Sequence, residues 1–119
     1  MYKLLIVDDE RIVIDAVKFI VKKEIPNIVV ERTASTGREA IQAASEVKPD
    51  IVLMDIRMPG INGIEAIKEI KKIYSDVQFV IMSAYEQFEF AKQSVELGVV
   101  DYLMKPVNKA KIISTLVKI

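Results

Sequence analysis

The chain has 119 residues, of which 51% are hydrophobic and 29% charged, a composition typical of one soluble globular domain. Lys and Arg together number 17, as do Asp and Glu, so the basic excess that marks direct nucleic-acid binding is missing. The chain contains no Cys and no His, which excludes disulfides, thiolate chemistry, His-based triads and most zinc sites. Its first apolar run, residues 4–7, is too short for a signal peptide or a membrane span. We expect a cytoplasmic protein without membrane contact.

The first half of the chain alternates between apolar runs and segments with helical spacing. Residues 4–7, rich in branched side chains, predict a strand. Residues 11–24 carry apolar side chains at helical intervals, which predicts a helix that ends before Pro26. A second strand is expected over 28–34 and a second helix over 37–47.

The alternation continues three more times in the second half. Residues 51–54 predict a third strand, and the turn signals in 58–63 separate it from a helix over 64–73. The remaining expected elements are, in order, a strand over 77–82, a helix over 86–97 that Gly98 ends, a strand over 99–104, and a helix that Asn108 caps and that runs to the terminus.

Five successive strand–helix units predict an α/β fold with a parallel sheet and helices on both of its faces. The first, third and fourth strands are apolar throughout, as strands buried on both faces are. Residues 28–34 are more polar, which suits a strand at the edge of the sheet. The sequence therefore predicts a flavodoxin-like (βα)5 three-layer sandwich with a five-stranded sheet in the order 2-1-3-4-5.

Polar side chains follow four of the five strands. They are Asp8 and Asp9 after the first strand, Asp55 after the third, Ser83 after the fourth and Lys105 after the fifth. Ligands of parallel α/β sheets bind beyond the carboxyl ends of the strands, and these four strands are neighbours in the expected order. We therefore predict that the five side chains converge on one crevice.

Three neighbouring carboxylates repel one another, and a hard divalent cation such as Mg²⁺ relieves the repulsion through oxygen ligands. One carboxylate can then attack phosphorus and form an aspartyl phosphate, while the cation offsets the charge of the phosphoryl group. An ammonium and a hydroxyl group can bind the remaining phosphate oxygens. The expected cofactor is Mg²⁺, or Mn²⁺ in its place.

Each of these residues also has a simpler explanation when it is taken alone. Either acid after the first strand could cap the first helix, and Asp55 could begin a turn. Ser83 could cap a helix or lie in a turn. Lys105 could be a solvated lysine and Tyr102 a filler of core or surface. Unrelated caps, however, give no reason for acids on two strands to coincide with a base on a third.

Several short motifs occur in order along the whole chain. They are Val7-Asp8-Asp9-Glu10, Leu53 to Gly60 with Asn62-Gly63, Met82-Ser83-Ala84-Tyr85, Gly98 with Asp101-Tyr102, and Lys105-Pro106. Together they resemble the receiver domains of two-component response regulators, which have the CheY-like form of the expected fold. The resemblance implies a phosphorylation-dependent signalling switch, not an enzyme, although such a domain takes part in its own phosphorylation and dephosphorylation.

The resemblance implies a role for each residue of the crevice. Asp55 is expected to accept the phosphoryl group in a reaction that needs the divalent cation. Asp8 and Asp9 are expected to hold that cation together with Asp55 and the backbone carbonyl of Arg57. No position of the set is missing from this sequence.

The residues after the fourth strand and around the fifth are expected to bind phosphate and transmit its presence. Ser83 and Lys105 would contact phosphate oxygens, and the Lys105–Pro106 peptide bond would be cis. Movement of Ser83 toward the phosphate would vacate space into which Tyr102 can rotate. Ser83 and Tyr102 are therefore the expected switch pair.

Two long side chains are expected to set the lifetime of the acyl phosphate. Arg57 lies two positions past Asp55, and Tyr85 lies two positions past Ser83. Both are expected to project over the mouth of the crevice, where they could screen the phosphoryl group from water.

The implied partner is a sensor histidine kinase that donates the phosphoryl group. Residues 83–92 and 99–107 further resemble regulators whose output is an AraC-type helix-turn-helix pair. The face formed by the fourth helix, fifth strand and fifth helix is expected to control an output, transcription, and to support a modest homodimer on phosphorylation. DNA would be bound through the output domain and not by residues 1–119.

That face is expected to expose some apolar side chains, namely those of Phe88, Phe90, Ile112, Leu116 and Ile119. The stripe of the last helix continues to the final residue without a stop signal. We interpret residues 1–119 as a receiver domain cut from a longer chain, with the output domain missing.

Two other functions use similar sheets. Phosphatases with an aspartyl-phosphate intermediate carry a second acid two residues past the nucleophile, where this chain has Arg57. A nucleotide- or flavin-binding module would be supported by a Gly-rich loop after the first strand, where this chain has Asp8-Asp9-Glu10-Arg11. Tight nucleotide binding, or turnover of a general phosphate ester, would count against the switch.

Overall fold

The computed structural model describes residues 1–84 and 88–119. The strands are β1 (Tyr2–Val7), β2 (Ile28–Ala34), β3 (Ile51–Asp55), β4 (Gln78–Ser83) and β5 (Asp101–Met104). The helices are α1 (Arg11–Glu24), α2 (Gly37–Val47), α3 (Gly63–Ile73), α4 (Phe88–Glu96) and α5 (Lys109–Val117). None of these five helices is long and apolar enough to cross a membrane.

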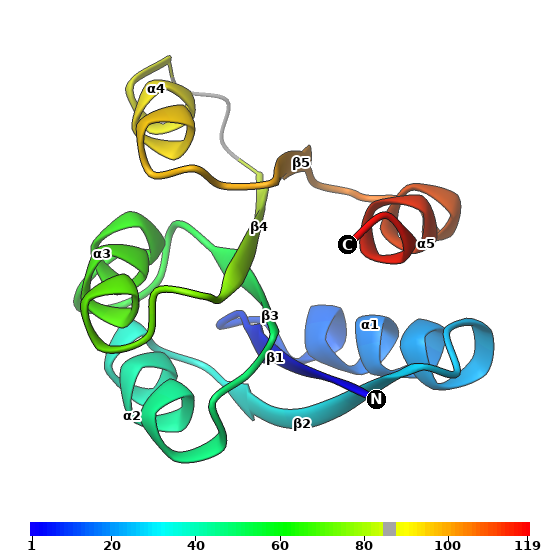
Figure 1. Cartoon of the computed structure of the whole chain (residues 1–119). Coiled ribbons are helices and arrows are strands. Elements are labelled where there is room, and N and C mark those ends of the chain that lie inside the picture. The colour runs from blue at the N-terminus through cyan, green and yellow to red at the C-terminus, as the bar shows by residue number, and fades with distance from the viewer. Residues whose placement is uncertain (85–87) are drawn as a thin grey trace.

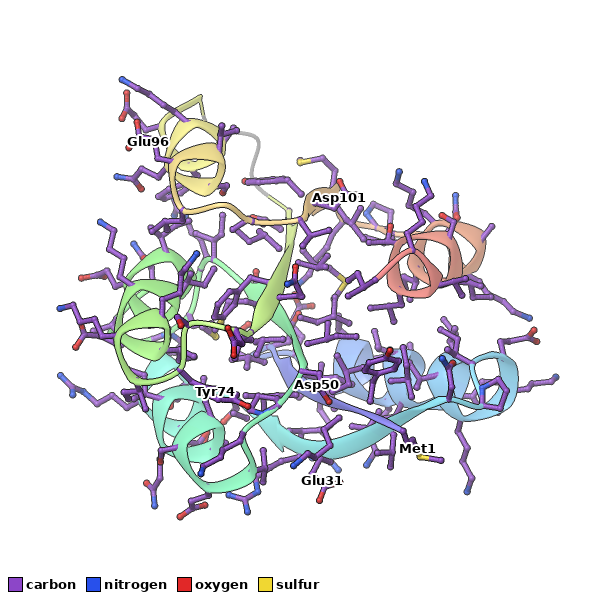
Figure 2. The ribbon with its side chains drawn as sticks, viewed as in Figure 1. Met1, Glu31, Asp50, Tyr74, Glu96 and Asp101 are labelled. Atoms are coloured by element: carbon purple, nitrogen blue, oxygen red, sulfur yellow. The ribbon has the colours of Figure 1, made fainter. Side chains whose placement is uncertain are left out.

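The strands pair in parallel in the order β2-β1-β3-β4-β5 (Figure 1). This order confirms the predicted flavodoxin-like, CheY-like fold. It leaves β2 at one edge, which explains the polar composition of that strand: Glu31 and Arg32 are exposed, and Glu31 lies at the rim of the molecule (Figure 2). Every residue of β3, near the middle of the sheet, is buried.

Helices cover both faces of the sheet. Helices α1 and α5 lie against one face, and α2, α3 and α4 lie against the other (Figure 1). Because successive residues of a strand point to opposite faces, each face has its own core. Leu4 and Ile6 of β1 pack beneath α1 and α5, while Leu5 and Val7 pack beneath the other three helices.

In the described part of the chain, side-chain caps begin three of the helices. The Thr36 hydroxyl accepts a backbone N–H of α2. The side chains of Asn62 and Glu65 form a reciprocal capping box at the start of α3. Asn108 accepts a backbone N–H of α5, which confirms the predicted cap. All three caps fix loops at the carboxyl edge of the sheet.

The region around α4 differs from the predicted bounds. The helix predicted over 86–97 extends over Phe88–Glu96 in the described part of the chain. The strand predicted over 99–104 begins only at Asp101. The reason is the helix end: Gly98 adopts a φ of +74°, and the residue after it still donates a hydrogen bond back to α4.

The apolar stripe of α5 faces the core instead of forming the exposed patch expected of it. Ile112 and Leu116 are 4% and 2% exposed, and Ile119 packs partly buried against the same core. Phe90 of α4 is also partly buried, against the opposite core, and the side chain of Phe88 is outside the described part. A single apolar stripe on α5 has to cover the sheet, so it is not available to a partner.

Candidate functional site

The acid pair after β1 is divided between the interior and the surface. Asp8 is fully buried, whereas Asp9 is exposed. The backbone N–H of Asp8 donates to the Ala34 carbonyl of β2 at 3.0 Å, and Asp8 Oδ1 accepts the Glu10 N–H at 2.9 Å. Helix α1 has Glu10 as its N-cap residue and no side-chain cap. The simpler explanation of the acid pair as a helix cap therefore does not hold.

Asp55 is the last residue of β3, and only 4% of it is exposed. The pKa of its carboxyl group is raised to about 6, chiefly by burial, because water no longer solvates the charge well. Within this balance the Lys105 ammonium lowers the pKa, and the nearby Asp8 and Asp9 carboxylates raise it. Asp55 is thus still mainly a carboxylate at neutral pH, but one that is poorly solvated.

The first turn of α3 packs directly on the backbone of Asp55. The Gly63 N–H donates to the Ile56 carbonyl at 2.8 Å. A Cβ atom at Gly63 would lie 2.0 Å from the carbonyl oxygen of Asp55. The position therefore requires glycine for the close approach, and α3 helps to fix the direction of the Asp55 side chain.

Lys105 comes directly after β5 and reaches into the crevice. Its Nζ lies 2.7 Å from Asp8 Oδ2 and 3.4 Å from Asp55 Oδ2, and only 12% of the side chain is exposed. The Lys105 N–H donates to the Ser83 carbonyl at 2.8 Å, and the Lys105–Pro106 peptide bond is cis, the geometry that the resemblance implied. Lys105 is not a solvated surface lysine.

The charge of Lys105 depends on its carboxylate neighbours. Burial alone would lower the pKa of its ammonium group. The contacts with Asp8, Asp55 and Glu10 outweigh burial and raise the pKa overall. Lys105 consequently stays positively charged within a crevice whose other charged groups are acids.

Ser83 and Tyr102 lie on the neighbouring strands β4 and β5. Ser83 is fully buried at the end of β4 and pairs with Met104 in the sheet register. Tyr102 pairs with Ile81 and is partly buried against the core beneath α2, α3 and α4. The structure thus places the hydroxyl-bearing residue beside the crevice and the tyrosine on the adjoining strand.

Arg57 is exposed beside the mouth of the crevice. It lines a surface hollow of about 520 Å³ together with Asp9, Met58, Pro59, Asn62 and Phe90. Arg57 therefore lies on the Asp9 side of the mouth. Tyr85, its expected counterpart, falls outside the described residues.

The acids after β1 fit a divalent cation. Carboxylate oxygens of Asp8, Asp9 and Glu10 all lie within 4.8 Å of one another. Asp8 Oδ2 is buried and close to the Lys105 ammonium, yet no described group forms a hydrogen bond of good geometry with it. A buried carboxylate oxygen with this unmet capacity, next to further acids, is a suitable ligand for Mg²⁺.

Glu10 is a charged neighbour of the crevice to which the sequence pattern assigned no role. Its Oε1 lies 3.5 Å from Lys105 Nζ, although the two residues are 95 positions apart. One signal was present in the sequence: Glu is not among the residues that favour the N-cap position. That signal alone does not identify the partner of the side chain.

A comparison with protein families matches residues 4–117 to the response regulator receiver domain. The chain is 40% identical over 119 residues to the uncharacterized transcriptional regulatory protein YesN of Bacillus subtilis (strain 168), covering all of this chain and 32% of YesN. It is 38% identical over 117 residues to the chemotaxis protein CheY of Thermotoga maritima, covering 98% of this chain and 96% of CheY. The chain thus spans about a third of YesN and nearly all of CheY.

Solved structures show the same fold. The receiver domain of AraT, a response regulator from Geobacillus stearothermophilus, has a TM-score of 0.90 at 26% identity, covering 98% of this chain and 91% of that one. A CheX–CheY–BeF3–Mg complex from Borrelia burgdorferi has a TM-score of 0.91 at 25% identity, covering 98% and 87%. These are similar to the present chain over its whole length.

Proposed function

The chain belongs to the receiver-domain family of response regulators, and on this basis we propose that Asp55 is the residue that accepts the phosphoryl group. The observation that carries the proposal is the environment of Asp55. Its carboxyl group is buried at a strand end, beside the acids of β1, with the Lys105 ammonium 3.4 Å away. A poorly solvated carboxylate next to a fixed cation can attack an electrophile at little cost in lost hydration.

The donor is a phosphohistidine of a sensor histidine kinase. An oxygen of the Asp55 carboxylate forms a bond to phosphorus while the phosphorus–nitrogen bond breaks. The electron pair of that bond stays on the imidazole nitrogen, and the imidazole leaves neutral when its second nitrogen carries a proton. Lys105 and the Ser83 hydroxyl hold phosphoryl oxygens during the transfer.

The acids supply the expected cation site. Asp8, Asp9 and Asp55, with the backbone carbonyl of Arg57, would hold Mg²⁺ or Mn²⁺, which offsets the negative charge of the phosphoryl oxygens. Asp9 is exposed and Asp8 is buried. Asp9 would therefore meet a cation that enters from solvent, and Asp8 would be a fixed ligand inside the crevice. Arg57, and Tyr85 by sequence position, would then control access of water to the acyl phosphate.

The output is transmitted through the face formed by α4, β5 and α5. Attraction of the Ser83 hydroxyl to a phosphoryl oxygen frees space for Tyr102 to rotate, and the face changes shape. Among the side chains that the structure describes on these elements, the exposed large apolar ones are Val95, Met104 and Val117. We propose that they support a modest homodimer and that a cytoplasmic output domain, of AraC type and beyond these residues, regulates transcription.

The direct test is phosphorylation of the purified chain with acetyl phosphate and Mg²⁺. We expect the mass gain of one phosphoryl group, mapped to Asp55 and labile to hydroxylamine. Chelation of the metal, or the substitution Asp55→Asn, should abolish it, whereas Asp76→Asn, at an exposed acid outside the crevice, should not. Labelling of Asp8 or Asp9 in the wild type would contradict the assignment, and sustained turnover of general phosphate esters would favour a phosphatase.

A further inference from the structure

Glu10 is the N-cap residue of α1, but its side chain does not cap the helix. Its carbonyl accepts the N–H groups of Val13 and Ile14 and so begins α1. Its own N–H is held by Asp8 Oδ1 at 2.9 Å. Its side chain, however, forms no cap hydrogen bond. The backbone of Glu10 is therefore fixed, and its carboxylate is not needed for the helix.

The Glu10 carboxylate instead reaches across to the loop after β5. Its Oε1 lies 3.5 Å from Lys105 Nζ. The same ammonium group lies 2.7 Å from Asp8 Oδ2 and 3.4 Å from Asp55 Oδ2. A lysine ammonium has three N–H donors, and three carboxylates surround this one. A phosphoryl group attached to Asp55 offers new oxygens to this ammonium, and Asp8 and Glu10 are the partners that then compete for it.

Of the three carboxylates, Glu10 is the one placed to give way. Asp8 and Asp55 are buried, whereas 57% of the Glu10 side chain is exposed. Glu10 and Lys105 also line a largely apolar surface groove of about 450 Å³ between α1 and the loop after β5. The Glu10 carboxylate can return to water when its partner leaves, and a buried carboxylate cannot.

We propose that Glu10 is a positioning residue that holds the Lys105 ammonium toward the groove end of the crevice until a phosphoryl group is present at Asp55. The inference rests on the proposed function of Asp55. Glu10 competes with the phosphoryl oxygen for the ammonium, so it lowers the affinity of the crevice for phosphate. No covalent step is added: Lys105 exchanges one oxygen partner for another and keeps its charge.

The test is the affinity of the Mg²⁺-loaded protein for beryllofluoride, a phosphoryl mimic. Glu10→Gln should bind it about two- to fivefold more tightly than the wild type, the range that a partly exposed ion pair supports. The initial rate of phosphorylation by acetyl phosphate should rise by a similar factor. The midpoint of urea unfolding should not change, because no helix cap is lost.

Two further variants separate a specific contact from a general effect of charge. Asp15→Asn removes one exposed carboxylate from the same helix, but Asp15 pairs with Arg11 at 3.3 Å, and this variant should bind beryllofluoride like the wild type. Glu10→Asp keeps the charge but shortens the side chain, so it should behave like Glu10→Gln. Wild-type affinity in Glu10→Asp, or an increase in Asp15→Asn equal to that of Glu10→Gln, would overturn the proposal.

A metal-ligand role for Glu10 predicts the opposite sign. In that case Glu10→Gln would weaken Mg²⁺ binding and, with it, the binding of beryllofluoride. Unchanged or weaker binding in Glu10→Gln therefore rejects the positioning role while Asp55 remains the acceptor. If the wild type itself takes up no phosphoryl group at Asp55, the proposed function fails first.

Discussion

At the scale of single residues, the crevice holds charged side chains that lie close together and are poorly exposed to water. Asp8 and Asp55 are buried, and the ammonium of Lys105 lies between them. Mutual repulsion and poor solvation are unfavourable for the two carboxylates. The same features favour the binding of a divalent cation, whose charge offsets theirs.

The raised pKa of Asp55 predicts a pH-dependent effect on stability. The pKa of the folded protein, about 6, exceeds the ordinary value of 3.8, so the folded state binds the proton more tightly than the unfolded state. The contribution of this group to stability is full below pH 3.8 and falls as pH rises to about 6. Asp55→Asn has no charge to bury and should be roughly 2–3 kcal/mol more stable than the wild type above that window.

The measurement is urea unfolding of both proteins in metal-free buffer at a series of pH values. The advantage of Asp55→Asn should shrink as pH falls from 7.5 toward 4. Because both proteins share all other titrating groups, their difference isolates Asp55. An advantage that is the same at every pH would contradict the burial argument.

At the scale of elements, the first turn of α3 packs against the backbone of Asp55 at the end of β3. The capping box of Asn62 and Glu65 begins the helix, and Gly63 then brings its first turn against the backbone of Asp55. The helix start, the glycine and the strand end thus form one tightly packed unit. We therefore expect a displacement of α3 to shift the end of β3.

Gly63→Ala should disturb this unit. Its Cβ would lie 2.0 Å from the Asp55 carbonyl oxygen, which cannot move without moving the strand end. We expect a loss of about 1–3 kcal/mol in the free energy of unfolding and slower phosphorylation by acetyl phosphate. Both would be measured by urea unfolding and by single-site mass gain over time.

Gly37→Ala is the matched control for this substitution. Its closest contacts would be Ile61 Cγ1 at 2.5 Å and the Ile61 carbonyl oxygen at 3.0 Å, a milder clash than that at Gly63 and one that does not involve Asp55. It should cost less stability and leave the phosphorylation rate near that of the wild type. Equal phosphorylation rates for the two variants would show that α3 does not position Asp55.

At the scale of the whole molecule, two separate cores hold the sheet between its helices. Because the apolar stripe of α5 packs into the core beneath α1 and α5, the described side chains on the face of α4, β5 and α5 include only scattered exposed apolar ones. Val95, Met104 and Val117 are 79%, 38% and 63% exposed. Such a face favours weak association that a small change of shape can strengthen.

Phosphorylation should therefore promote a modest dimer through that face. Sedimentation of the wild type with Mg²⁺ should show a shift toward dimer when beryllofluoride is added. Val95→Asp would place a charge in the contact and should weaken the dimer by about tenfold or more.

Phe19→Asp, at a 65% exposed position on α1, provides the control on a different face and should dimerise as the wild type does. Loss of dimerisation in this variant but not in Val95→Asp would place the interface elsewhere. If beryllofluoride binds to the wild type without changing either its self-association or the environment of Tyr102, the switch is transmitted by another route.

Much of the fold and of the crevice could be predicted from local patterns. Short apolar runs predicted the strands, and apolar residues at helical spacing predicted the helices. The polar character of residues 28–34 predicted that this strand lies at the edge of the sheet. Parallel strands present their carboxyl ends at one side of the sheet, and this rule predicted that Asp8, Asp55 and Lys105 lie close together. Their separations in the structure agree with it. Each of these inferences depends on neighbours in sequence or on a general rule of topology.

What only the tertiary structure decided depends on contacts between distant segments. The inward direction of Ile112 and Leu116, the start of β5 at Asp101 and the contact of Glu10 with Lys105 are of this kind. The pKa of Asp55 also follows from how deeply the folded chain buries it. The sequence by itself determined which chemical groups meet at the sheet edge, because their order along the strands is local. Their solvation and their competing partners were decided by packing, because burial and charge–charge contact exist only once the chain has folded.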